Sequence, residues 1–324
     1  LNTTKTAYHL YTNEDLAKKL IYVESSRGCP FSCDFCLSAL KTDSKVREFP
    51  LEQFLTEMDK LVKRGVKTFK FLDRTFNSNI TRAIQICEFF LEKIEERKKT
   101  GQDIPLVVHF EMVPSLFSSG LNEVLTRFPP GTLRLEIGFQ TLNTKVAARI
   151  RVPSKPAKDL ETLRLLCEKT NAIIHADLIA GLPGENLKSF GRGFDRLWQA
   201  LSAGHNIEIQ VGILKQLPGA PISRHNDDWG MRYAPLPPYE VEETSVLSTG
   251  DLQRIKNFAR FWELIVNRGL IKFAKKESIF DEFMAFSGIL FAHFGRNWGI
   301  DRNELLKFIL DGNSLISLKL LQTF

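Results

Sequence analysis

The stretch RGCPFSCDFC, residues 27–36, places Cys29, Cys33 and Cys36 within eight residues. It directly follows an apolar run, residues 20–26, that predicts a β-strand. Three thiolates this close together can bind one soft metal centre. A zinc site takes four nitrogen or sulfur ligands, and no fourth cysteine or histidine lies near this loop in the sequence. Three thiolates suit a 4Fe–4S cluster that keeps one iron open for a ligand. A zinc knuckle and unliganded loop cysteines are the alternatives.

The other two cysteines, Cys87 and Cys167, lie far away on predicted helices. An odd, sparse set of five is not the disulfide framework of a secreted domain. The N-terminus lacks the apolar core of a secretory leader, and no apolar run reaches the ~18 residues of a membrane span. We therefore expect a cytoplasmic protein with no membrane partner. The chain begins at Leu1 rather than at methionine, which we interpret as missing upstream sequence.

Composition indicates an ordinary globular protein. The chain is 43% hydrophobic and 25% charged, which excludes the disordered and collagenous classes. Its net charge of +6 comes from basic residues that are scattered among acidic ones. Because they form no block or stripe, we expect no nucleic-acid partner.

Strand-like and helix-like segments alternate along most of the chain. The predicted strands are residues 20–26, 66–73, 106–112, 132–139, 172–180 and 207–214. The predicted helices are residues 51–64, 80–99, 115–128, a piece from Thr144, 157–169 and 187–202. This alternation predicts an α/β fold with a parallel sheet and right-handed crossovers. Six repeats favour a partial (β/α)6 TIM-type barrel over a closed barrel of eight.

The last third of the chain has a different pattern. Residues 218–240 are rich in Pro and Gly and predict a loop. From Asp251 the chain is predicted to be helical, and its last 74 residues hold ten Phe and two Trp, which indicates a helical core or, in part, a substrate-lining wall. The expected domains are an N-terminal extension, a barrel, a linker and a C-terminal helical domain: residues 1–19, 20–220, 221–250 and 251–324.

The cysteine motif resembles that of the radical SAM superfamily. The three-then-two spacing, the aromatic Phe35 before the last cysteine and the place after the first strand all match. The resemblance implies a 4Fe–4S cluster on the three cysteines, whose open iron binds the amino and carboxylate groups of S-adenosylmethionine. It also implies reductive cleavage of S-adenosylmethionine to methionine and a 5′-deoxyadenosyl radical. A reductant such as flavodoxin or ferredoxin is then a partner, with a small-molecule or peptide substrate.

Barrel active sites lie at the carboxyl ends of the strands, so the resemblance places the cofactor contacts there. The residues that it implies are Phe35, Asp73, Arg74, Thr75, Glu111, Gln140, Arg151, Asp177, Ile179 and Lys215. Asp73 to Thr75 match by position only, because this chain lacks the family's paired glycines, and a capping turn is the alternative. Arg151 adjoins Val152, where the family has its arginine. Lys215 faces the substrate or solvent.

Three of these positions have further support. Glu111 lies in an apolar strand, where a carboxyl needs a partner, and the coproporphyrinogen dehydrogenases of the superfamily have a cofactor-binding glutamate there. A buried ion pair is the alternative, and the adjacent His109 is expected to be structural. In EIGFQT (136–141), Gln140 is implied to bond the ribose or the carboxylate. In DLIAGLPGE (177–185), Asp177 matches a cofactor-binding aspartate and Ile179 the residue that packs on adenine.

Three longer stretches of sequence resemble one group within the superfamily. YVESSRGCPFSCDFC (22–36), FKFLDRTFN (69–77) and YAPLPPYEV (233–241) look like a group that usually carries an N-terminal cobalamin-binding domain and a C-terminal helical domain. The sequence contains no DxHxxG cobalamin motif. We therefore expect cobalamin as a cofactor, and methyl transfer as the reaction, only if an upstream domain exists. The alternatives are a non-catalytic iron–sulfur or zinc module that binds partners or carries electrons, and a tRNA-modifying radical enzyme.

Overall fold

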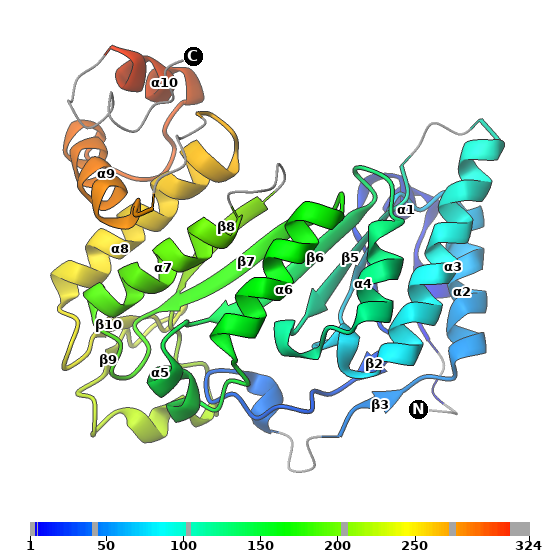
Figure 1. The fold of residues 1–324 in the computed structure, drawn as a ribbon, viewed down its shortest axis with the longest axis horizontal. Coiled ribbons are helices and arrows are strands. Elements are labelled where there is room, and N and C mark those ends of the chain that lie inside the picture. The colour runs from blue at the N-terminus through cyan, green and yellow to red at the C-terminus, as the bar shows by residue number, and fades with distance from the viewer. Residues whose placement is uncertain are drawn as a thin grey trace.

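A six-stranded parallel sheet lies at the centre of the computed structural model, which describes residues 4, 6–40, 45–101, 105–201, 207–271 and 277–311. Its strands are β1 (Ile21–Val23), β4 (Thr68–Phe71), β5 (Val107–Met112), β6 (Leu133–Gln140), β7 (Ile173–Ala180) and β8 (Ile207–Ile213). The strands lie in chain order, each parallel to the next, so β1 and β8 form two open edges (Figure 1). The predicted α/β fold with six β units is confirmed.

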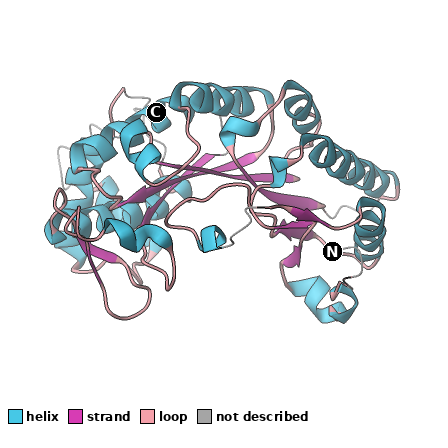
Figure 2. Cartoon of the chain, turned by 90° about the horizontal axis from the view of Figure 1, so that it is seen from below, coloured by secondary structure: helices cyan, strands magenta, loops and turns pink. Residues whose placement is uncertain are grey.

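Helices connect the strands and continue beyond them. They are α1 (Asn13–Lys18), α2 (Leu51–Lys63), α3 (Ile80–Lys99), α4 (Ser119–Thr126), α5 (Thr144–Arg149), α6 (Pro156–Lys169), α7 (Leu187–Leu201), α8 (Thr249–Trp262), α9 (Phe280–Phe294) and α10 (Arg302–Leu310). Figure 2 shows a row of helices along the outer side of the sheet. None of the helices in the described part of the chain is long and apolar enough to cross a membrane.

Short elements complete the fold. The 3-10 helices are η1 (Tyr8–Leu10), η2 (Leu37–Leu40), η3 (Phe76–Ser78), η4 (Pro114–Leu116) and η5 (Pro221–His225), and a π-helical turn, η6 (Glu263–Asn267), follows α8. Two antiparallel pairs are β2 (Ser26–Arg27) with β3 (Arg47–Glu48) and β9 (Arg232–Tyr233) with β10 (Val241–Glu243).

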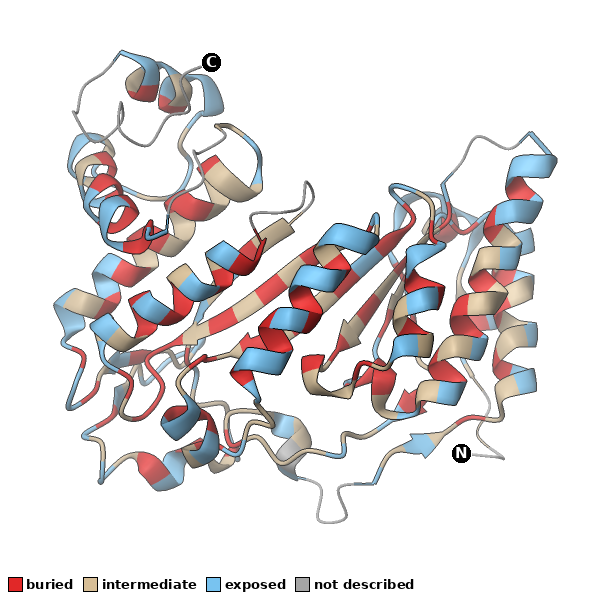
Figure 3. Cartoon of the chain, viewed as in Figure 1, coloured by how far each residue is buried: buried red, intermediate tan, exposed pale blue. Residues whose placement is uncertain are grey.

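The two faces of the sheet differ in character. Along β5 and β7 every second residue is buried, and these residues, such as Phe110 and Ile174, join the core beneath the helices (Figure 3). The alternate residues, such as His109 and Asp177, are only half-buried and point to the opposite, inner face. The period of two along each strand therefore separates an apolar core from a polar interior.

Helix α3 shows how local sequence sets an element. The Asn79 side chain accepts a hydrogen bond from the Arg82 amide at 3.2 Å and caps the first turn. Three cationic residues occupy the last turn, where they interact favourably with the helix dipole. Gly101 follows with a φ of 69°, a left-handed conformation that favours glycine. The helix has the predicted bounds, residues 80–99.

The segment after β8 is more ordered than predicted. Within the predicted loop 218–240 the chain forms η5 and β9, and β9 pairs with β10. Ile222 and His225 of η5 are buried. Elements of two to five residues are too short to give a periodic signal, so the sequence pattern could not indicate them. The predicted domain boundaries stay predictions.

The C-terminal helices pack on α7 through aromatic rings. Phe194 of α7 lies 4.9 Å from the ring centre of Phe258 and 4.8 Å from that of Trp262, both in α8. Phe280 and Phe283 of α9 complete this buried cluster. The predicted helical aromatic core is therefore confirmed for these residues, whereas Phe273 and Phe324 lie outside the described part of the chain.

A buried carboxylate joins the ends of β1 and β4. Asp73 is 1% exposed and accepts hydrogen bonds from the Ser25 amide at 2.8 Å and from the Ser25 and Ser26 hydroxyls at 2.7 Å each. Arg82 donates to the Ser25 carbonyl at 3.0 Å, which places a cation beside the same junction. These contacts hold Ser25 and Ser26, which directly precede the segment that carries the three cysteines.

We expect Asp73→Asn to destabilise the fold, because the amide nitrogen of asparagine would face donors. A buried donor left without an acceptor costs about 1–3 kcal/mol, and urea unfolding followed by circular dichroism measures this loss. Asp228→Asn, at an exposed position, is the matched control and should change the unfolding free energy by less than about 0.5 kcal/mol. Equal stabilities of the two variants would contradict the assignment.

Candidate active site

The three clustered cysteines lie in the loop that follows β2, here called the cysteine loop (residues 28–36). Gly28 begins it with a φ of 107°. A Cβ at this position would overlap the carbonyl oxygen of Lys45, so the close approach of the two chains requires glycine. The cysteine loop then crosses the carboxyl ends of the central strands.

Cys29, Cys33 and Cys36 line one cavity of about 190 Å³, here called the cysteine cavity. All three are half-buried and free. Cys29 Sγ lies 3.4 Å from Thr75 Oγ1. Burial raises the pKa of the Cys33 thiol to about 12, and the neighbouring Cys29 and Cys36 add to the rise. A positively charged metal centre would offset the cost of ionising these thiols.

The donor set fits a cluster rather than a single ion as its occupant. Among the described residues, no group of three or more His, Cys, Asp or Glu side chains is arranged to hold one metal ion. The thiolates of a 4Fe–4S cluster each bind a different iron atom, so their sulfurs need not converge on a single point.

Polar side chains from four neighbouring strands, at or near their carboxyl ends, complete the cysteine cavity. Thr75 follows β4, Glu111 lies near the end of β5, Gln140 ends β6 and Asp177 lies in β7. Gln140 has a φ of 63°, and the register of β6 against β7 shifts at this point. A Cβ on Gly138 would collide with the Gln140 amide, so the missing side chain lets the amide fold back beside the strand.

Three carboxyls in this interior have very different environments. Burial raises the pKa of Asp177 to about 8, and Glu136 and Glu111 add to the rise. Burial, and then Glu136, also raises the pKa of Glu111. Hydrogen bonding from His109, followed by Lys70, lowers the pKa of Glu136 to about 2. The ionised Glu136 therefore favours the neutral forms of its two neighbours.

Lys70 and His109 hold Glu136 in place. Lys70 Nζ lies 3.0 Å and His109 Nε2 3.3 Å from Glu136 Oε2. His109 also stacks on His175, which lies 3.0 Å from Glu208. The expected structural place of His109 fits these contacts. Glu136 itself was not among the predicted site residues, because its role depends on partners from other strands.

The structure distributes the other predicted residues over several places. Phe35, Arg74, Thr75, Glu111, Gln140 and Asp177 line the cysteine cavity. Asp73 does not, because its carboxylate is enclosed by Ser25 and Ser26. Arg151 contacts the cysteine loop from outside. Ile179 and Lys215 line a second, larger cavity instead.

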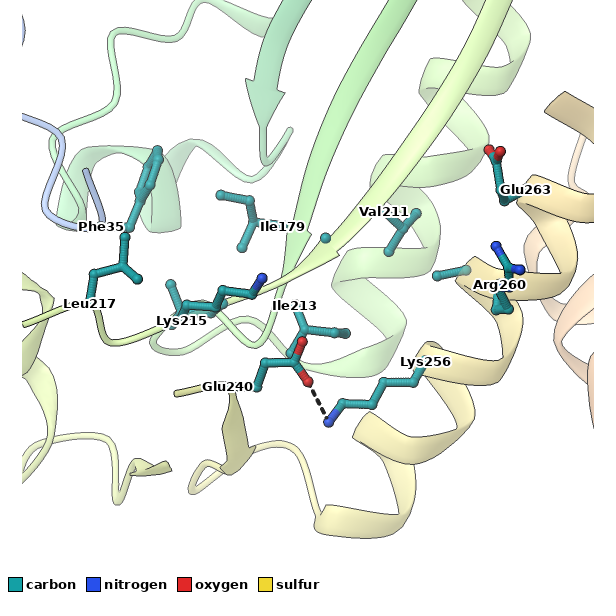
Figure 4. A pocket seen from close by; sticks show the side chains of 13 residues that line it. Phe35, Ile179, Val211, Ile213, Lys215, Leu217, Glu240, Lys256, Arg260 and Glu263 are labelled. Carbon is teal, nitrogen blue, oxygen red and sulfur yellow. Dashed lines mark ion pairs between the residues drawn. The ribbon is translucent and has the colours of Figure 1, made fainter. Parts of the chain in front are cut away.

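This second cavity, here called the edge cavity, has a volume of about 610 Å³ and lies between the edge strand β8 and helix α8 (Figure 4). Its apolar wall comprises Phe35, Ile179, Val211, Ile213 and Leu217. Phe35 lines both cavities. Ile179 lies two residues beyond Asp177 on β7, so one lining residue of each cavity lies about 7 Å from the other along the same strand.

A buried carboxylate, paired with partly exposed arginines, anchors the cysteine loop and was not predicted from the sequence. Asp34, between Cys33 and Cys36, is 0% exposed. Its carboxylate lies 3.3 Å from Arg151 Nε and 2.8 Å from His225 Nε2, and it also pairs with Arg224. The Asp34 amide donates to the Ile150 carbonyl at 3.0 Å. Nothing in the sequence marks Asp34, because Arg224 and His225 lie about 190 residues away.

Comparisons with known proteins agree with this geometry. Residues 23–197 match the model of the radical SAM superfamily. The chain is 25% identical over 189 residues to the tRNA-2-methylthio-N(6)-dimethylallyladenosine synthase of Bdellovibrio bacteriovorus, covering 57% of this chain and 40% of the relative. It is 24% identical over 216 residues to the cobalamin-dependent radical SAM methyltransferase TokK of Streptomyces tokunonensis, covering 65% and 30%. The chain thus spans less than half the length of these relatives.

A solved structure shares the fold. The radical S-adenosylmethionine methyltransferase TsrM of Kitasatospora setae superposes with a TM-score of 0.54 at 16% identity, covering 71% of this chain and 43% of that one. The family model covers more than half of the chain, including the cysteine loop and β2 to β7, which is enough to assign the chain to the family. The protein belongs to the radical SAM superfamily.

Proposed function

We propose that Cys29, Cys33 and Cys36 hold a 4Fe–4S cluster and that the cysteine cavity binds S-adenosylmethionine beside it. When bound, the reduced cluster and S-adenosylmethionine supply reductive cleavage of the sulfonium, which releases methionine and a 5′-deoxyadenosyl radical. The observation that carries the proposal is the convergence of three half-buried thiols with polar groups from four neighbouring strands.

Each residue of the cysteine cavity has a defined task in this proposal. Glu111 and Gln140 present polar groups that orient the amino acid and ribose parts of S-adenosylmethionine. Asp177 accepts hydrogen bonds from hydroxyls. Met112 and Val152 contribute apolar surface that excludes water from the reacting centre. The protein thus binds and orients, while the cofactors carry out the bond cleavage.

The edge cavity holds the substrate in this proposal. It shares Phe35 with the cysteine cavity and continues along β7 from Asp177 to Ile179. A molecule in the edge cavity therefore lies beside the place where the radical forms. An electron carrier needs no such second cavity, so this geometry favours the enzyme over a non-catalytic iron–sulfur module.

Methyl transfer with cobalamin is the reaction that the relatives support best. The similarity to TokK, a cobalamin-dependent methyltransferase, supports it. A cytoplasmic flavodoxin or ferredoxin fits as the electron donor.

Anaerobic reconstitution should yield about four iron and four sulfide per chain. We expect Cys29→Ala, Cys33→Ala and Cys36→Ala each to lose most of this iron, whereas Cys167→Ser, a cysteine on α6 away from the site, should retain it. With dithionite and S-adenosylmethionine, the parent chain should form 5′-deoxyadenosine, measured by liquid chromatography. A colourless, iron-free parent chain would overturn the proposed function.

The raised pKa of Asp177 predicts how S-adenosylmethionine binding depends on pH. If hydroxyls of the ligand donate to the ionised carboxylate, binding must first remove its proton below pH 8. Affinity should then rise about tenfold from pH 7 to pH 9, and level off above the pKa of about 8. Titration calorimetry of the reconstituted chain measures this profile.

Asp177→Asn is the control for this profile. Any titration of the ligand itself affects both proteins equally, so the ratio of their affinities isolates Asp177. A ratio that stays constant from pH 7 to pH 9 would contradict the role of Asp177.

A further inference from the structure

The charges around the edge cavity are unevenly compensated. Lys256 Nζ pairs with Glu240 Oε2 at 2.8 Å, the ion pair drawn in Figure 4. Glu263 accepts hydrogen bonds from Asn267 at 2.9 Å and from Arg268 at 3.1 Å. Both acidic groups of the lining therefore already have partners within the protein.

Two cations of the lining, Lys215 and Arg260, have no acidic partner among the residues that the structure describes. Arg260 donates from Nε to the Asn297 carbonyl at 3.2 Å, and no carboxylate in the described part of the chain pairs with Arg260 or Lys215. In Figure 4 the Lys215 ammonium group projects between Ile179 and Ile213, over the apolar wall. A cavity with this lining offers an apolar surface and, beside it, uncompensated positive charge.

We propose that the edge cavity binds an amphipathic organic anion, with its apolar body against Phe35, Ile179 and Ile213 and its carboxylate or phosphate at Lys215. The volume of about 610 Å³ suits a ligand of this kind. That this anion is the substrate of the enzyme rests on the proposed function. The apolar end then lies beside Phe35, on the side of the cysteine cavity.

The test compares an anionic probe with its uncharged analogue. The probes are 1-anilinonaphthalene-8-sulfonate and 1-anilinonaphthalene, titrated by fluorescence into the full chain with and without its cluster. In Lys215→Met the dissociation constant of the sulfonate should rise about fivefold, since Lys215 is exposed and its charge is screened. The uncharged probe should bind as before, and Lys215→Arg should retain the affinity for the sulfonate.

Two further variants locate the binding and control for overall charge. Gly212→Phe fills the edge cavity and should weaken both probes, because nothing nearer than the Leu178 carbonyl at 3.7 Å meets a Cβ there. Lys188→Met, exposed on α7, should change neither. If the Lys215 variants fail to fold, raising the salt concentration should still weaken only the sulfonate.

Equal loss of both probes in Lys215→Met, or an unchanged affinity for the sulfonate, would overturn the anion preference. Iron content is measured separately, so a chain that takes up no iron would refute the proposed function and leave this comparison valid.

A second inference comes from the cysteine loop itself. We propose that the Asp34 carboxylate, balanced by Arg151 and Arg224, sets the reduction potential of the cluster as well as anchoring the loop. Asp34 lies between two of the three ligands and is fully buried, so little water screens its charge. Reduction adds negative charge to the cluster, and nearby fixed charges favour or oppose it.

Shifts of the reduction potential in opposite directions in two variants distinguish this role from a merely structural one. Asp34→Asn removes a negative charge and should raise the reduction potential, increasing the ratio of reduced to oxidised cluster about threefold or more at a fixed potential. Arg224→Gln removes a positive charge and should lower that ratio. Both variants break the same ion pair, so loosening of the loop should accelerate iron release to a chelator in both.

Redox titration followed by electron paramagnetic resonance measures the potentials. Arg254→Gln, an exposed position on α8, is the control and should leave the potential unchanged. Shifts of the same sign in both variants, or no shift, would overturn this inference alone. Hydrogen exchange of residues 221–229 in the iron-free chain tests the anchoring separately, and it should rise in Asp34→Asn.

Discussion

The ion pairs of the buried Asp34 carboxylate are the constraint on which the site depends. The cysteine loop has no helix or strand of its own between β2 and η2, so its shape must come from contacts with other segments. Asp34 supplies them from within the motif, by joining the segment after α5 to the segment that contains η5. The loop is therefore held by chain that follows β6 and β8. The positions of the three thiols in the folded protein therefore depend on contacts with later parts of the chain.

Charge compensation governs the interior of the sheet in the same way. Several ionisable groups point to the inner face, where burial penalises isolated charge. Lys70 and His109 stabilise one carboxylate, Glu136, in its ionised form. Burial, and then the negative charge of Glu136, raises the pKa of both Glu111 and Asp177. The interior thus combines one fixed charge with two carboxyls whose ionisation can respond to a bound ligand.

Sequence patterns predicted the features that depend on local order. The period of two along the strands and of 3.6 along the helices indicated the six β units, and α3 has its predicted bounds because both of its ends carry capping signals. The cysteine motif was recognisable because its three cysteines lie within eight residues. Contacts between distant segments were not accessible: the partners of Asp34 and Glu136 come from other elements, and no periodicity links them. Asp73 was predicted to line the cysteine cavity. Its carboxylate instead binds Ser25 and Ser26, and these partners lie too far away in the sequence to be predicted.

Phe35 belongs to the cysteine loop and also to the wall of the edge cavity. Any ligand that orders this ring orders the loop that carries the thiols, and any group that orders the loop presents the ring in a defined position. Thermodynamic linkage makes such an effect reciprocal, so each site would tighten the other by the same factor. One side chain thus couples the two cavities directly, so a ligand in the edge cavity would also restrict the segment that carries the three cysteines.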